Sequence, residues 1–98
     1  MRKVIVASSP KSWTVYILRC REASLYTGIT TDLERRVEQH KKGLASRYTR
    51  ARLPVILVFQ QHGFDHSSAL KREREIKKWS RREKLNLIKK ARQESGPG

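Results

Sequence analysis

Five side chains of the types that hold and hydrolyse a phosphodiester lie along this 98-residue chain. They are two tyrosines, an arginine, a histidine and a glutamate: Tyr16, Tyr26, Arg36, His40 and Glu73. A guanidinium can hold a phosphate or the extra charge of a phosphoryl-transfer transition state. A phenol, with a pKa of about 10, is a base at neutral pH only where nearby cations stabilise the phenolate. Together these groups are typical of a small nuclease.

Glu73 has an inward-facing position on a predicted helix. The helical face with i, i+4, i+7 and i+11 spacing consists of Ala69, Glu73, Ile76 and Ser80. A carboxylate buried there needs a cation, because an unpaired buried charge is costly. Mg²⁺ commonly binds proteins through one or two carboxylates, with phosphate oxygens and waters as further ligands. The spacing leaves two alternatives open, a salt bridge to a basic neighbour and a metal site.

Each of the other candidates also has an ordinary structural alternative. Arg36 and His40 are four residues apart, so they share one face of a helix. The alternative to a phosphate-binding role for Arg36 is a charged side chain in solvent, and the periodicity does not distinguish the two. Tyr16 and Tyr26 lie on adjacent predicted strands, where their phenols meet if both face the same way. Ordinary packing of amphipathic strands is the alternative for each tyrosine.

The charge balance narrows the class of partner. Lys and Arg number 23 and Asp and Glu number 9, which gives a net charge of +14. Such an excess favours polyanions, with nucleic acid as the first partner class and an anionic membrane surface as the second. No apolar run approaches transmembrane length. The single cysteine, Cys20, excludes an intrachain disulfide and fits a reducing compartment, so we expect a cytoplasmic protein.

Two basic clusters are predicted to contact nucleic acid. The first combines three arginines with an aromatic ring: Arg47, Tyr48, Arg50 and Arg52. It could lie against a phosphate backbone or stack on a base. The second belongs to the charged C-terminal third and includes Lys77 and Lys78. It could follow a phosphate backbone, and the alternative is a solvated helix face.

The elements that position these side chains follow from the periodicity. Alternation over residues 13–18 and 25–30 predicts two strands joined in a hairpin. Gly28, inside the second strand, removes a side chain beside Tyr26 and suggests that another group approaches closely there. A helix follows over residues 31–42, with a capping box formed by Thr31 and Glu34.

The second half of the chain continues with one strand and two helices. Gly43 ends the first helix, residues 46–52 form a basic loop, and the apolar run 55–59 predicts a buried, central strand. Two further helices are predicted over residues 66–79 and 81–92. Their start signals are Asp65 as an N-cap and a capping box of Ser80 and Glu83.

The predicted fold is α+β, with a three-stranded antiparallel sheet flanked by helices in the order β-β-α-β-α-α. The length corresponds to one domain, which we place at residues 12–92. Residues 1–11 are an N-terminal extension, and residues 93–98 are expected to be a flexible tail.

The chain resembles the small, single-domain bacterial members of the GIY-YIG nuclease superfamily. The residues that carry this resemblance are Thr14-Val15-Tyr16, Tyr26-Thr27-Gly28, Arg36, His40 and Glu73. Their combined order and spacing, over about residues 12–90, make the signal specific. Thr14-Val15 stands in place of the Gly-Ile of the name motif, and Ile29 replaces a lysine that some DNA-repair members carry after the second motif.

The resemblance implies a single-metal phosphodiesterase with defined roles for these residues. Tyr16 would be the general base or a relay for the attacking water, and Tyr26 would position that water or the scissile phosphate. Arg36 would stabilise charge on the phosphate, and His40 would assist proton transfer or orient Tyr16. Glu73 would bind Mg²⁺ or Mn²⁺, which would also stabilise the leaving oxygen.

The expected activity is metal-dependent cleavage of nucleic acid, with DNA favoured over RNA and a role in DNA repair or processing. The sequence contains no added DNA-binding module, so affinity must come from the domain's own charge, from a protein partner or from a homodimer. A non-catalytic nucleic-acid-binding domain on the same fold is the alternative function. A third hypothesis is a structural protein of a ribonucleoprotein particle, and a preference for RNA over DNA would distinguish it from the first two.

Overall fold

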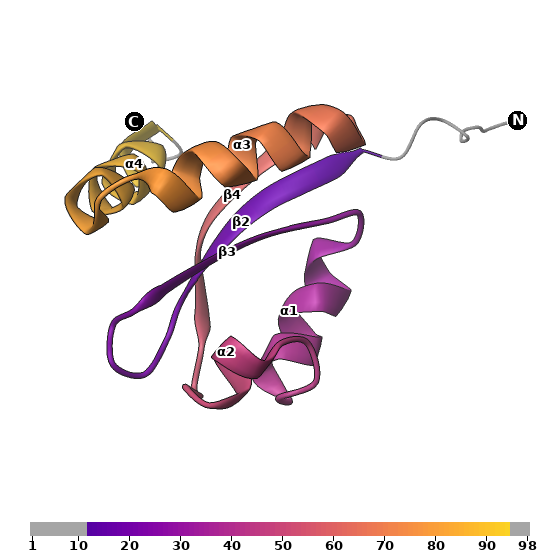
Figure 1. Ribbon diagram of the computed structural model, residues 1–98, viewed down its shortest axis with the longest axis vertical. Helices are drawn as coiled ribbons and strands as arrows, with labels where there is room; N and C mark the ends of the chain where they lie inside the picture. Colours follow the sequence, from indigo (N-terminus) through magenta and orange to yellow (C-terminus); the bar gives the residue numbers. More distant parts are fainter. Residues whose placement is uncertain (1–11, 95–98) are drawn as a thin grey trace, which may run out of the picture.

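Three strands form an antiparallel sheet in the computed structural model, which describes residues 12–94 (Figure 1). They are β2 (Trp13–Arg19), β3 (Leu25–Thr30) and β4 (Ile56–Phe64), in the spatial order β3-β2-β4. The helices of the described region are α1 (Leu33–Lys41), α2 (Arg47–Arg50), α3 (His66–Lys78) and α4 (Arg81–Glu94). The predicted α+β class and the order β-β-α-β-α-α are confirmed, with the one-turn helix α2 added.

The central strand is β2, and the prediction that residues 55–59 form the central strand is wrong. β4 lies at an edge of the described sheet. Its first part is flanked by the buried Val55 and contains the buried Phe59, whereas residues 60–63 are exposed. An apolar run indicates that a strand is buried, but it does not specify whether the strand lies at the centre or at an edge of the sheet. Residues 14–18 of β2 are all buried, as expected for a strand with a neighbour at each edge and helices over each face.

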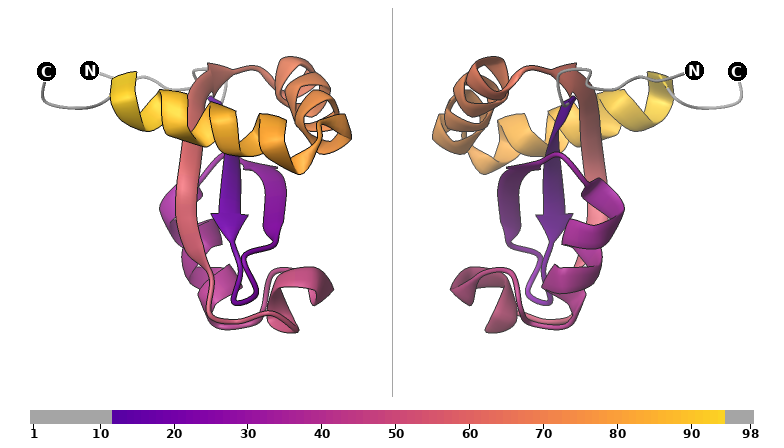
Figure 2. Two further views of the ribbon diagram at one scale, coloured as in Figure 1. Left: turned by 90° about the vertical axis from the view of Figure 1, so that its left-hand side faces the viewer. Right: turned by 90° about the vertical axis from the view of Figure 1, so that its right-hand side faces the viewer.

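The alternation along β2 sends side chains into two separate cores. Val15 and Ile17 pack with Ile76 of α3 and with residues of α4 on one face of the sheet. Tyr16 and Leu18 pack on the other face, against apolar residues of α1 and of the segment after α2. Figure 2 shows α4 across one face of the strands and α1 on the opposite side. The period of two in β2 therefore separates a mainly apolar core from a core that contains Tyr16.

The predicted starts of the last two helices are confirmed. Asp65 is the N-cap of α3, and its Oδ1 accepts a hydrogen bond of 2.7 Å from the backbone N–H of Ser68. At the start of α4, the N–H of Ser80 donates to Glu83 Oε1 at 2.8 Å, and the N–H of Glu83 donates to Ser80 Oγ at 3.2 Å. This reciprocal pair is the predicted capping box.

The start of α1 differs from its prediction by one residue. The N-cap is Asp32, whose Oδ1 accepts from the backbone N–H of Arg35 at 3.2 Å, so the capping box predicted at Thr31 and Glu34 is wrong. A carboxylate at this position satisfies a free N–H and also interacts favourably with the helix dipole. The predicted end of the helix is confirmed, because Gly43 follows it with a φ of +76°.

The predicted basic loop over residues 46–52 contains the short helix α2. Ser46 is its N-cap, and the backbone N–H of Thr49 donates to Ser46 Oγ at 3.1 Å. A single turn is too short to produce a helical period, so only the cap residue could have signalled it. Because of this turn, Thr49 is fully buried between exposed neighbours.

The limits of the domain are only partly described. The predicted extension at residues 1–11, and residues 95–98 of the predicted tail, lie outside the described residues. α4 continues to Glu94 and so extends beyond the predicted helix end at residue 92. Within the described region, no helix combines the length and apolar character that would be needed to cross a membrane.

Replacing Thr27 by valine is expected to stabilise the protein. Thr27 is buried in β3, and its Oγ1 has no hydrogen-bond partner among the described residues. A methyl group of the same shape removes the cost of burying an unpaired hydroxyl, so the free energy of unfolding should rise by about 1 kcal/mol. Urea unfolding of both proteins measures this change, and a lower midpoint for the variant would contradict it.

Candidate active site

The Tyr16 phenol lies over Gly28. The two residues are direct partners in the β2–β3 register. A Cβ atom added at Gly28 would lie 2.6 Å from Tyr16 Oη and 2.7 Å from Tyr16 Cζ, which is too close for any side chain. The close approach expected at Gly28 is therefore made by Tyr16. Since Tyr26 pairs with Leu18, both phenols point to the same face of the sheet.

A buried hydrogen bond joins Tyr16 to His40, in the last turn of α1. Tyr16 Oη and His40 Nε2 are 2.8 Å apart, and each residue is 1% exposed. Burial raises the pKa of Tyr16 to about 12, and the nearby Tyr26 adds to this effect. Burial, followed by the positive charge of Arg36, lowers the pKa of His40 to about 4. At neutral pH the pair therefore consists of a protonated phenol and an uncharged imidazole.

Arg36 and Glu73 act on the same phenol from different helices. The guanidinium of Arg36 lowers the pKa of Tyr16, whereas the carboxylate of Glu73 raises it. Arg36 also donates from Nη1 to Gln39 Oε1 at 3.2 Å and is only partly exposed. All five predicted residues are thus gathered around Tyr16, although they come from β2, β3, α1 and α3.

Glu73 forms an ion pair with Lys77, one turn later on α3. Lys77 Nζ lies 3.1 Å from Glu73 Oε2, and the side chains are 52% and 17% exposed, respectively. The salt bridge left open by the spacing is therefore present. Ala69 and Ile76, on the same helix face, are buried, so Glu73 sits at the border between core and solvent.

The residues around Glu73 fit a metal ion that takes most of its ligands from elsewhere. No group of three or more His, Cys, Asp or Glu side chains within residues 12–94 could enclose a cation. One partly exposed carboxylate suits Mg²⁺ or Mn²⁺ when phosphate oxygens and waters complete the coordination. The Lys77 ammonium shows that this carboxylate already attracts a cation.

Thr49 is a member of the site that the sequence reasoning missed. Its Oγ1 lies 2.8 Å from His40 Nδ1, so both ring nitrogens of His40 have a partner. Thr49 is 0% exposed. The available signal was a Ser-x-x-Thr spacing from Ser46, which places a hydroxyl inside a capped turn.

The first predicted nucleic-acid cluster divides into two parts. The Tyr48 ring stacks on Tyr26 with centroids 5.8 Å apart, and Arg52 Cζ lies 3.8 Å from the Tyr48 centroid. Arg52 also donates from Nη1 to the Tyr48 carbonyl at 3.0 Å. Tyr48 thus contacts both Tyr26 and Arg52 and is also 36% exposed. Arg47 and Arg50 are exposed beside it.

The second predicted cluster is also divided. Lys77 is paired with Glu73 and so borders the five-residue site. Lys78, at the end of α3, is exposed to solvent. The cluster therefore contributes one lysine at the site and one on the adjoining surface.

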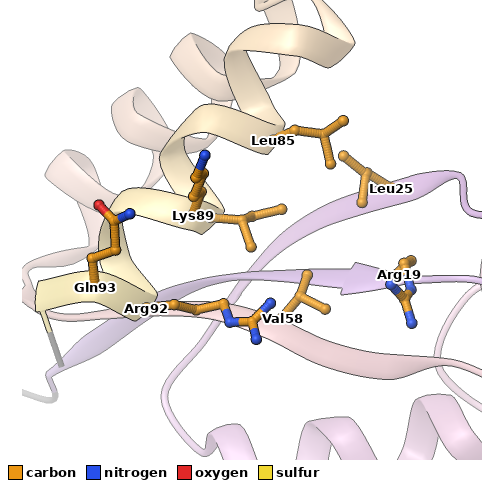
Figure 3. Close-up of a pocket in the computed structure, with 8 residues that line it drawn as sticks. Arg19, Leu25, Val58, Leu85, Lys89, Arg92 and Gln93 are labelled. Atoms are coloured by element: carbon orange, nitrogen blue, oxygen red, sulfur yellow. The ribbon is translucent and has the colours of Figure 1, made fainter. Parts of the chain in front are cut away.

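A cavity of about 600 Å³ lies away from these residues, between α4 and the sheet (Figure 3). Its lining includes Leu25 and Val58 of the strands and Leu85, Lys89 and Arg92 of α4. Leu25 faces the sheet side opposite to Tyr26, because the two are consecutive strand residues. None of the candidate catalytic residues lines it.

The buried His40 should make the stability of the protein depend on pH. Its pKa falls from 6.5 to about 4 on folding, so between these values the unfolded chain binds more protons. The stability contributed by neutral His40 is complete above about pH 6.5 and is lost as the pH falls towards 4. The expected loss is about 3 kcal/mol at about 1.4 kcal/mol per pKa unit.

Urea unfolding between pH 4 and 6.5 should show that the free energy of unfolding rises with pH. The substitution His40→Gln should make this slope smaller. Equal slopes in the two proteins would contradict the assignment.

Comparison with known proteins covers most of the chain. A family model described as the GIY-YIG catalytic domain matches residues 12–86. The UPF0213 protein SAV0488 of Staphylococcus aureus is 51% identical over 75 residues, which are 76% of this chain and 92% of the relative. The UPF0213 protein SH2523 of Staphylococcus haemolyticus is 47% identical over 74 residues, with 76% and 90% covered.

Two solved structures have the same fold. The solution structure of the UPF0213 protein BH0048 from Bacillus halodurans matches with a TM-score of 0.54 and 40% identity, over 88% of each chain. That of the protein EF2693 from E. faecalis matches with a TM-score of 0.60 and 34% identity, over 90% of this chain and 94% of the other.

Proposed function

The chain belongs to the GIY-YIG family of nucleases, and from this premise we propose that it is a divalent-metal-dependent endonuclease that hydrolyses DNA. The observation that carries the proposal is the buried Tyr16–His40 hydrogen bond, with Arg36 and Glu73 acting on the same phenol. A structural tyrosine needs neither a neutral histidine acceptor nor two opposite charges nearby. These groups are those required to move a proton beside a charged phosphate.

Proton transfer runs through Tyr16 as a relay. With a pKa of about 12, the phenol is protonated at neutral pH, so Oη accepts a proton only as it passes its own to His40 Nε2. The oxygen of a water molecule forms a bond to phosphorus and loses its proton to Tyr16 Oη. The bond from phosphorus to the leaving oxygen breaks, and its electron pair stays on that oxygen, which takes a proton from solvent. Neutral His40 holds the proton released by Tyr16.

The other residues bind and orient the substrate. Arg36 holds a phosphate oxygen and stabilises the charge that develops there. Tyr26, supported by the Tyr48 ring, positions the water or the scissile phosphate. Glu73 would hold Mg²⁺ or Mn²⁺, which supplies charge stabilisation at the leaving oxygen.

Substrate affinity comes from the basic surface. The net charge of +14 and the exposed Arg47, Arg50 and Lys78 supply phosphate contacts around the site. We place the activity on DNA rather than RNA, in DNA repair or processing, and in the cytoplasm. A homodimer or a protein partner would extend the contact surface.

Cleavage assays test this function. Purified protein is incubated with plasmid DNA, branched DNA and RNA of the same sequence, each with Mg²⁺, Mn²⁺ or EDTA. The expected result is cleavage of DNA that requires the metal and is weaker on RNA. Binding that falls steeply with salt, with no product from any substrate, would instead favour the second function, a non-catalytic nucleic-acid-binding domain supported by the same charge.

A further inference from the structure

His40 is held at both ring nitrogens inside the protein. Nε2 lies 2.8 Å from Tyr16 Oη, and Nδ1 lies 2.8 Å from Thr49 Oγ1. A neutral imidazole carries one proton, so one nitrogen donates and the other accepts. Which nitrogen accepts decides whether His40 can take a proton from Tyr16.

The partners of Tyr16 settle the position of that proton. Among the described residues, the acceptor within reach of the buried Tyr16 hydroxyl is His40 Nε2, at 2.8 Å, because the neighbouring Arg36 guanidinium can only donate. A buried donor without an acceptor is costly, so the phenol must donate to Nε2. Nδ1 then carries the ring proton of His40 and needs an acceptor, which is Thr49 Oγ1.

Thr49 can accept because its own proton has another destination. Its Oγ1 can donate to Ser46 in two ways, to the side-chain Oγ at 2.9 Å or to the carbonyl oxygen at 3.4 Å, and the carbonyl can only accept. The backbone N–H of Thr49 donates to Ser46 Oγ at 3.1 Å, which holds the turn in place. The hydrogen bonds can thus point in one direction, from Tyr16 to His40, from His40 to Thr49 and from Thr49 to Ser46.

We propose that Thr49 is a positioning residue that holds His40 in the Nδ1–H tautomer, so that Nε2 is free to receive the proton of Tyr16. The inference rests on the proposed function and deepens it. It makes α2 part of the proton-transfer machinery, although α2 contributes no residue to the predicted catalytic set. Without the hydroxyl of Thr49, Nδ1–H loses its acceptor and the opposite tautomer blocks the relay.

The test compares two identical substitutions at buried threonines. Thr49→Val removes the hydroxyl that contacts His40, whereas Thr27→Val removes a hydroxyl without a partner among the described residues, on the other face of the sheet. Long-range ¹H–¹⁵N spectra report the tautomer of His40 without any substrate. We expect Nδ1–H in wild type and Thr27→Val, and a shift to Nε2–H in Thr49→Val. Cleavage should fall about 10- to 100-fold in Thr49→Val, as for the loss of a group that orients a catalytic histidine.

Conservative rescue separates positioning from packing. Thr49→Ser keeps the hydroxyl and should retain both the Nδ1–H tautomer and cleavage; if the valine variant does not fold, Thr49→Ala takes its place in the comparison. A folded variant without the hydroxyl that keeps the Nδ1–H tautomer, or that changes tautomer without losing cleavage, would overturn the proposal. If wild type cleaves nothing, the proposed function fails, while the tautomer comparison still decides the role of Thr49.

Discussion

Replacing Glu73 by glutamine is expected to reduce metal-dependent cleavage by about 1,000-fold while leaving the fold intact. The amide keeps the shape of the side chain but removes the charge that attracts a divalent cation. Metal ions supply several kcal/mol of transition-state stabilisation, and about 1.4 kcal/mol corresponds to a tenfold change in rate. The lost ion pair with Lys77 is partly exposed, so stability should change by less than about 0.5 kcal/mol.

Glu75 provides a matched control on the same helix. It is also paired with a basic residue of α3, since Arg72 Nη1 lies 2.7 Å from Glu75 Oε1. Its side chain is 52% exposed, and it has no part in the site around Tyr16. Glu75→Gln should therefore cleave at the wild-type rate. Mn²⁺ titration in the presence of uncleavable DNA should show weaker binding for Glu73→Gln alone. Equal losses in both variants, or none in Glu73→Gln, would exclude Glu73 as the metal ligand.

Replacing Tyr16 by phenylalanine should lower the rate of cleavage by about 100- to 10,000-fold, the range for losing a positioned acid–base group. The ring remains over Gly28, but the relay between water and His40 Nε2 is interrupted. The buried Nε2 also loses its partner, which should cost about 1–3 kcal/mol of stability. Single-turnover cleavage with saturating protein measures the chemical step apart from binding.

A second hydroxyl–histidine pair on β2 serves as the control for this experiment. Thr14 Oγ1 lies 2.8 Å from His62 Nδ1, the same separation as in the Tyr16–His40 pair. Thr14→Val removes that bond from the same strand, so it should lower stability with little change in the rate of the chemical step. Comparable rate losses in the two variants would show that strand integrity, rather than proton transfer, controls cleavage.

The sequence was sufficient for features that depend on neighbouring residues. Alternation over residues 13–18 and 25–30 predicted the hairpin, and the Ser80–Glu83 capping box predicted the start of α4. Both signals are local, because strand period and helix caps involve residues only a few positions apart. Gly28 also indicated a close approach before its partner was known. The same local signals misplaced the start of α1, where Thr31 and Asp32 are adjacent and both are N-cap residue types.

The site itself was only half determined by the sequence. Residue types and spacing identified the candidates, and the helical stripe through Glu73 indicated a carboxylate beside a cation, which is now seen as Lys77. The roles of Tyr16, Tyr26, Arg36, His40 and Glu73 stay predictions. Tyr48 and Arg52 could not be judged from composition, because a ring among cations looks the same whether it is free or already stacked.

Only the tertiary structure decided the strand order and the environment of His40. An apolar run predicts burial equally at the centre and at the edge of a sheet, so the position of β4 beside β2, at an edge of the sheet formed by residues 12–94, came only from the structure. The bonds of His40 reach Tyr16, 24 residues earlier, and Thr49, nine residues later, on a separate short helix. No local pattern encodes contacts at such separations. They arise when two helices and a strand bury their polar groups together and each group must find a partner.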